Sequence, residues 1–143
     1  SLINKDQIVL KEYINIGIAV DTEEGLVVPV IQDADKLSLE EISIKVKELA
    51  EKARNKKLLN TSLENRTITI SSLGKLGGIG FTPIINPPDV AIISMSKTYK
   101  RLVLAEELDI MPIAMSYDHR VINGADAGRF MVFLKDILDN FND

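Results

Sequence analysis

The sequence predicts an α/β fold in which helices cover a mixed sheet. Three observations predict it: short β-branched runs at residues 13–20 and 25–31, a long amphipathic helix after them, and a second apolar helix near the C-terminus. Both runs are nearly continuous in apolar character, which favours strands covered on both faces. The polar residues DTEE at 21–24 suit a hairpin turn, so the two strands are expected to pair.

The first helix is expected to begin after Ser38. Glu41 follows Ser38 by three residues, which is the spacing of a capping box, and positive charge at residues 54–57 suits the C-terminal end of the helix dipole. Ile44 falls outside the apolar face. That face consists of Leu39, Ile42, Val46, Leu49, Ala50 and Ala53.

Three further strands and a last helix complete the prediction. Residues 66–72 alternate like a half-buried strand, a second strand follows Pro87 and Pro88, and residues 111–117 form the last strand. The final helix carries one apolar face, made of Phe130, Phe133, Leu134, Ile137, Leu138 and Phe141.

A glycine-rich loop, LGKLGGIG, follows the strand at 66–72. Gly74, Gly77, Gly78 and Gly80 permit a tight or left-handed backbone there. Neither a phosphate-loop pattern nor GxGxxG is present, so the loop is not assigned a nucleotide.

Composition limits the classes of function. The chain has 143 residues, the size of one domain, with 45% hydrophobic residues, no cysteine and one histidine. Disulfides and thiolate chemistry are excluded, no metal is expected, and a net charge of −4 argues against nucleic acid. No run approaches the ~18 apolar residues of a membrane span. We expect a cytoplasmic protein, with the mitochondrial matrix as the alternative.

His119, the only histidine, lies where the last strand gives way to the last helix. Considered alone it fits a structural residue better than a catalyst, Asn123 fits a plain helix N-cap, and Gly124 fits a turn residue. A hydrolase triad could use Ser116 or Ser71 with His119 and Asp118. However, no GxSxG elbow is present, and adjacent residues of a strand point to opposite faces.

The whole string DHRVINGA resembles the DHRxx(D/N)G signature of the dihydrolipoamide acyltransferases, the E2 components of 2-oxo acid dehydrogenase complexes, and of the related chloramphenicol acetyltransferases. The resemblance spans essentially the whole chain. It continues in NIGIAVDTEEGLVVPVI, DADKLSLEEI, ELAEKAR, TISSLGKLGG and FTPIINPPDVAI. It implies a chloramphenicol acetyltransferase-like fold truncated at the N-terminus, with residues 1–143 forming the C-terminal two thirds of one catalytic domain and no lipoyl or peripheral subunit-binding domain.

The resemblance also implies roles for single residues. His119 would be the general base that takes the thiol proton of CoA or dihydrolipoamide, and Ser71, with Ser72 as the alternative, would donate a hydrogen bond to the oxyanion. Asn123 stands where most members carry Asp, so it would support the site without providing charge. The expected substrate-binding residues are Asp21, close to the active site in relatives, Phe81, on the lipoyl side of their channel, and Gly74 of the glycine-rich loop.

In relatives, the site lies between neighbouring subunits of a trimer, and trimers assemble into larger cores. The resemblance therefore implies a homotrimer in a larger core, with E1 dehydrogenase and E3 dihydrolipoamide dehydrogenase as partners. It implies CoA and lipoamide as substrates, the lipoyl group being carried on another domain, and acetyl as the acyl group. Two alternatives stay open: a catalytically silent assembly module of such a complex, and a CoA-dependent acetyltransferase for a small acceptor.

Overall fold

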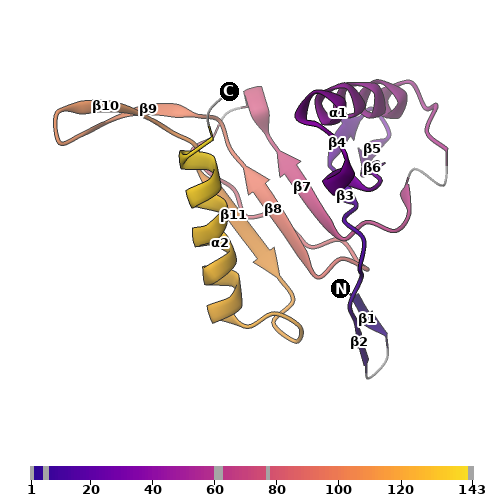
Figure 1. Ribbon diagram of the computed structural model, residues 1–143. Helices are drawn as coiled ribbons and strands as arrows, with labels where there is room; N and C mark the ends of the chain where they lie inside the picture. The colour runs from indigo at the N-terminus through magenta and orange to yellow at the C-terminus, as the bar shows by residue number, and fades with distance from the viewer. Residues whose placement is uncertain (1, 5–6, 60–62, 77, 142–143) are drawn as a thin grey trace.

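The computed structural model describes residues 2–4, 7–59, 63–76 and 78–141 (Figure 1). Its main sheet has five strands in the order β11-β8-β7-β3-β6. β7 (Ile68–Ser72) runs parallel to both β3 (Ile16–Ile18) and β8 (Ala91–Met95), whereas β6 (Val30–Ile31) and β11 (Ile113–Tyr117) are antiparallel to their neighbours. The predicted mixed sheet is confirmed.

Helix α1 (Leu39–Arg54) begins as the sequence predicts. The Ser38 hydroxyl accepts a hydrogen bond from the Glu41 amide at 3.2 Å, and the Glu41 carboxylate accepts one from the Ser38 amide at 2.8 Å. This capping box satisfies donors that the first helical turn leaves unpaired. Ala53 is buried and Ile44 is exposed, in agreement with the predicted face, but Leu39, which was assigned to that face, is 62% exposed at the start of the helix.

The hairpin expected at residues 13–31 is confirmed in its pairing but not in its continuity. Each arm is split: β3 pairs with β6 in the main sheet, whereas β4 (Val20–Thr22) and β5 (Gly25–Val27) form a separate two-stranded ribbon beside α1. Val30 and Ile31 of the main sheet and Val20 of β4 are buried, whereas Leu26 of β5 is largely exposed, so β5 is the less covered strand of the ribbon.

A buried polar network fixes β7 relative to its surroundings. The Asp89 carboxylate accepts hydrogen bonds from Arg66 Nε at 2.8 Å and from the Thr69 hydroxyl at 2.6 Å. A Cβ at Gly17 would lie 2.8 Å from Thr69 Oγ1, so glycine allows β3 to approach β7 closely. The predicted strand at 66–72 begins only at Ile68, and the Arg66 side chain instead holds the loop before β8.

Two hairpins were not predicted. β9 (Tyr99–Val103) and β10 (Glu106–Ile110) project away from the main sheet, and β1 (Leu2–Asn4) and β2 (Gln7–Val9) form a smaller hairpin near the N-terminus (Figure 1). The predicted last strand is shorter than expected: it begins at Ile113, because Pro112 precedes it and its carbonyl accepts a hydrogen bond from the Ser96 amide.

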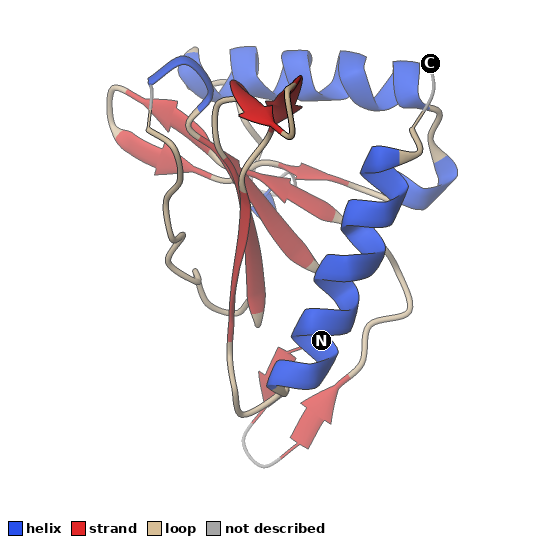
Figure 2. Cartoon of the chain, turned by 90° about the vertical axis from the view of Figure 1, so that its left-hand side faces the viewer, coloured by secondary structure: helices blue, strands red, loops and turns tan. Residues whose placement is uncertain are grey.

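Helix α2 (Gly124–Asp139) lies beside β11 at one edge of the sheet, and α1 lies beside β4 and β6 at the other. The axes of α1 and α2 point in clearly different directions (Figure 2). Most of the predicted apolar face of α2 is exposed: Leu134 is half-buried, but Phe130, Phe133, Ile137, Leu138 and Phe141 reach solvent. Neither described helix has the length and apolar run that a membrane span requires.

Candidate functional site

Ser71 lies near the C-terminal end of β7. It pairs in register with Ser94 of the parallel strand β8, and its side chain is half-buried. The next residue, Ser72, is exposed, and its hydroxyl accepts a hydrogen bond from the Gly74 amide at 3.2 Å. Because Ser72 supports the turn, Ser71 is the better placed of the two serines to meet a ligand.

The glycine-rich loop follows at the same end of the sheet. Gly74 and Gly78 have positive φ angles of 46° and 90°, as the sequence predicts, whereas Gly80 does not and Gly77 lies outside the described residues. Gly74 lines an open cavity of about 650 Å³ with Ser96, Lys97 and Thr98, and Phe81 after the loop is half-buried.

Asp21 is also at this end. It is exposed in β4, directly after β3, and Ile18 of β3 pairs in parallel with Ile70 of β7. Parallel strands end at the same edge, so Asp21 follows the same end of the sheet as Ser71.

His119 lies in a turn two residues beyond β11, and its side chain is exposed. Its ring contacts that of Tyr117, with the centroids 5.6 Å apart and the planes inclined by 42°. Among the residues that the structure describes, none is hydrogen-bonded to the imidazole. The ring nitrogens are therefore accessible to a ligand on the outside of this chain.

Asp118 is committed to Arg120. The guanidinium donates to the carboxylate at 3.0 Å from Nε and 2.6 Å from a terminal nitrogen, and the Arg120 amide donates to the same carboxylate at 3.0 Å. These hydrogen bonds lower the pKa of Asp118 to about 2. The Ser116 hydroxyl is equally committed, to the Pro83 carbonyl at 2.6 Å. The hydrolase triad of Ser116, His119 and Asp118 is therefore not assembled.

Asn123 is the N-cap of α2. Its side-chain oxygen accepts a hydrogen bond from the Asp126 amide at 2.9 Å, and its amide nitrogen donates to the Asp126 carboxylate. The expected capping role is confirmed. Gly124 is the first helical residue, and a Cβ there would lie 3.6 Å from the Tyr117 hydroxyl, an ordinary contact. The expectation that Gly124 makes the turn is wrong, since its position does not require glycine.

The structure divides the predicted residues into two groups, at opposite ends of the sheet. Ser71 is paired with Ser94, which is itself paired with Ala114, so these three residues lie at the same height along their strands. From Ala114, β11 runs to Tyr117, away from the end of the sheet where Ser71 lies. This run covers about 10 Å along the strands, and β7 and β11 lie about 10 Å apart across them. His119 lies beyond Tyr117, so its imidazole and the Ser71 hydroxyl cannot serve one small reacting group within one chain.

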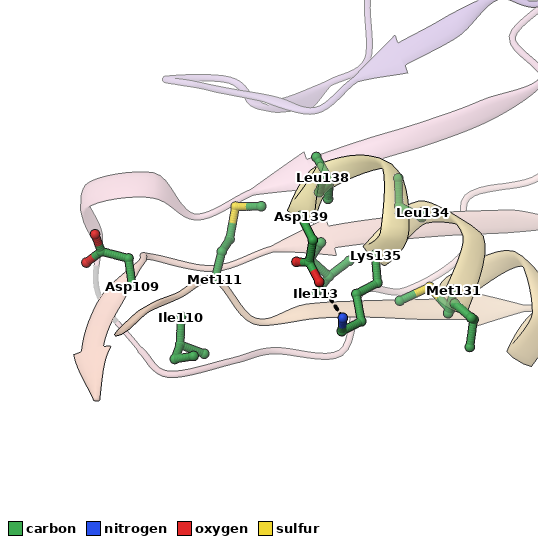
Figure 3. A pocket seen from close by; sticks show the side chains of 10 residues that line it. Asp109, Ile110, Met111, Ile113, Met131, Leu134, Lys135, Leu138 and Asp139 are labelled. Atoms are coloured by element: carbon green, nitrogen blue, oxygen red, sulfur yellow. Dashed lines mark hydrogen bonds and ion pairs between the residues drawn. The ribbon is translucent and has the colours of Figure 1, made fainter. Parts of the chain in front are cut away.

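A second cavity, of about 600 Å³, lies between α2 and the β10–β11 segment and was not predicted from the sequence (Figure 3). Met111, Ile113, Met131 and Leu134 make it largely apolar, and Lys135 forms an ion pair with Asp139 beside it. None of the predicted site residues lines it. Within the described ranges, no three side chains of His, Cys, Asp and Glu gather in a way that could hold a metal ion.

The structure defines an α/β protein with a mixed five-stranded sheet, and the two groups of candidate residues lie at opposite ends of that sheet. Comparison identifies the family. The sequence model described as "2-oxoacid dehydrogenases acyltransferase (catalytic domain)" matches residues 1–143, and the chain belongs to this family.

Two curated relatives illustrate the similarity. The chain is 49% identical over 141 residues to the dihydrolipoyllysine-residue acetyltransferase component of the pyruvate dehydrogenase complex of Cupriavidus necator, a match that covers 95% of this chain and 25% of the relative. It is 44% identical to the succinyltransferase component of the 2-oxoglutarate dehydrogenase complex of Rickettsia typhi, with 96% and 36% covered.

Solved structures agree with this assignment. The cubic core of a pyruvate dehydrogenase multienzyme complex matches with a TM-score of 0.91 and 46% identity, over 94% of this chain and 57% of that chain. The dihydrolipoamide acetyltransferase of Azotobacter vinelandii, studied for the role of a serine, a histidine and an asparagine in catalysis, matches with the same score and 45% identity, over the same shares. The chain thus spans about a quarter of the Cupriavidus relative and little more than half of these solved chains.

Proposed function

We propose that this chain transfers an acyl group between the dithiol of a lipoyl group and CoA. Its family membership supports acyl transfer, and the acetyltransferase among its relatives supports acetyl as the group moved. CoA and lipoamide are then substrates, with the lipoyl group presented by another domain, and the E1 and E3 enzymes of a 2-oxo acid dehydrogenase complex are the partners.

The proposed chemistry uses three residues. His119 takes the proton of the attacking thiol, the sulfur adds to the thioester carbonyl, and the Ser71 hydroxyl donates a hydrogen bond to the oxyanion that forms. The intermediate then expels the other sulfur, which receives the proton back from His119. Asn123 helps to orient the reacting groups at the end of the sheet where His119 lies. The relative from Azotobacter supports this set, since its asparagine follows its histidine by four positions, as Asn123 follows His119.

The separation of Ser71 from His119 within one chain is the observation that carries the proposal that the site forms between chains. We name Asp118–Arg120 the DHR turn. Around a trimer, the DHR turn of one chain would contact the end of the sheet that carries Ser71 in the next chain. A head-to-tail contact of this kind closes into a ring when its rotation allows. The resemblance to a cubic core supports assembly of such rings into a larger core.

Mixing two inactive variants tests the site between chains. His119→Ala and Ser71→Ala should each lower the rate of acetyl transfer from acetyl-CoA to dihydrolipoamide, by roughly 10²-fold or more for the base and 10²- to 10³-fold for the donor. When the two chains are co-expressed, a trimer with sites between chains regains up to about a quarter of the wild-type activity, because one interface in four combines both intact residues.

The control is a mixture of the two proteins prepared separately and combined after assembly, which should stay inactive. Activity that does not recover on co-expression would contradict a site shared between chains. A wild-type chain without transfer activity, but with the mass of an assembled core, would instead support the silent assembly module. The similarity to an assembled core is the observation that supports this second candidate, because assembly does not require transfer activity.

A further inference from the structure

Two serine hydroxyls hold one short segment against the sheet. We name Phe81–Pro83 the strap. The Ser94 hydroxyl of β8 donates to the Phe81 carbonyl at 2.9 Å, and the Ser116 hydroxyl of β11 donates to the Pro83 carbonyl at 2.6 Å. Ser94 is 1% exposed, and Pro83 is buried. The strap is thus bound to two neighbouring strands at both of its ends.

The strap crosses the face of the sheet that carries Ser71. Ser94 is paired with Ala114, and Ser116 with Ile92, so both serines point to one face. Ser71 is paired with Ser94 and shares that face. The opposite face carries Ile113, which lines the cavity under α2.

The strap therefore lies beside Ser71. Adjacent strands are about 4.8 Å apart, so Ser94, which binds the Phe81 carbonyl, is one strand away from Ser71. The glycine-rich loop joins the two, since it leaves β7 directly after Ser72 and ends at Phe81. Holding the strap in place therefore also holds the C-terminal end of the glycine-rich loop and the half-buried Phe81 side chain.

The serines are unexpected in their strands. Both interrupt largely apolar runs, Ala91–Met95 and Ile113–Tyr117, where a hydroxyl costs free energy unless it is hydrogen-bonded. Their acceptors in the strap are main-chain carbonyls outside the sheet ladder, which themselves need donors. Two hydroxyls on separate strands that converge on one three-residue segment point to a task beyond filling space in the core.

We propose that Ser94 and Ser116 are positioning residues that hold the strap and, through Phe81, shape the path of dihydrolipoamide beside Ser71. This inference rests on the proposed function. Neither serine touches the reacting atoms: each acts through the strap.

The first test needs no catalytic activity. Chymotrypsin cleaves after exposed phenylalanine, and the assembled protein should be cut after Phe81 several-fold faster in Ser94→Ala and in Ser116→Ala than in wild type. Ser116→Thr keeps a hydroxyl and should restore slow cleavage. The control, Ser43→Ala on the exposed side of α1, should change nothing. An unchanged rate of cleavage after Phe81 in both alanine variants would overturn the proposal that these serines hold the strap, whether or not the protein transfers acyl groups.

The second test separates positioning from simple destabilisation. Ser94→Ala and Ser116→Ala should raise the KM for dihydrolipoamide about 3- to 10-fold while the KM for acetyl-CoA stays constant, the pattern of lost ground-state binding to one substrate. In a Phe81→Ala background the same changes should have less than about a 2-fold effect, because residues that act through one group are not additive. Additive effects, or a lower Tm with both KM values unchanged, would overturn the proposal. A wild-type protein without transfer activity would refute the proposed function together with this role, and the cleavage result would then apply to the strap alone.

Discussion

At the residue scale, the DHR turn divides its work among neighbouring side chains. The Asp118 carboxylate binds the Arg120 guanidinium. The main-chain carbonyl of Asp118 accepts hydrogen bonds from the amides of Val121 and Ile122, at 3.0 Å each. His119, between Asp118 and Arg120 in the chain, remains exposed. The acidic and basic neighbours thus satisfy each other and shape the turn. This arrangement leaves the imidazole available without tying it to the adjacent carboxylate.

The Asp118–Arg120 pair should make stability depend on pH in acid. The pKa of Asp118 is lowered from 3.8 to about 2 in the folded chain, so the pair stabilises the fold above pH 3.8 and loses this effect as the pH falls through about 2. The Tm difference between wild type and Asp118→Asn should be constant above about pH 4.5 and should shrink between pH 4 and pH 2. Thermal unfolding followed by circular dichroism measures it.

Ser43→Ala, at an exposed position of α1 without a titrating side chain, is the control, and its Tm difference from wild type should not change across this window. A Tm difference for Asp118→Asn that stays constant from pH 5 to pH 2 would contradict the role of the pair.

The family resemblance named the candidate residues and implied a site between neighbouring subunits, whereas local residue patterns alone predict neither. Asn123 was predicted as a cap from its place before an apolar helix, and the structure confirms it. The division of Ser71 and His119 between opposite ends of the sheet depends on β11 running antiparallel to β8, and no local pattern encodes that pairing.

At the scale of elements, α1 could be predicted because its capping box and its 3.6-residue period agree. The β9–β10 hairpin could not. Its two-residue loop, Leu104 and Ala105, has φ angles of 50° and 69°, the shape that Asn-Gly normally signals. With leucine and alanine there, the turn carries no local sequence signal.

Replacing this loop by the favoured residues should stabilise the hairpin. Leu104→Asn with Ala105→Gly relieves the left-handed backbone at two positions, and we expect a gain of about 1 to 2 kcal/mol in the free energy of unfolding. Urea unfolding measures the gain. Val103→Asn, one residue earlier in β9, should destabilise instead. A lower stability for the double variant would contradict the prediction and would indicate that Leu104, 97% exposed in one chain, is buried in the assembly.

At the scale of the whole molecule, the single chain leaves a large apolar surface uncovered. The outer stripe, which we define as Phe130, Phe133 and Ile137 of α2 together with Phe141 just beyond its end, is exposed. Periodicity predicted that these residues share a face, but it cannot say whether the same chain or another one covers it. Contiguous apolar surface of this kind marks an interaction site.

Assembly should therefore depend on this stripe. Phe133 is 64% exposed in one chain, and exchanging an exposed phenylalanine for glutamine would leave an isolated chain almost unaffected. If the stripe is buried between chains, Phe133→Gln removes about 2 kcal/mol of apolar burial from every copy, and a closed ring loses it at each interface. Light scattering should then show the mass falling from that of the assembly toward the 15.8 kDa of one chain. Leu39→Gln, at a 62% exposed position of α1, is the matched control and should keep the assembled mass. An unchanged mass for Phe133→Gln would show that the chains contact one another through another surface. This experiment therefore tests where the chains are in contact, whereas the co-expression of the His119→Ala and Ser71→Ala variants tests whether they share a site.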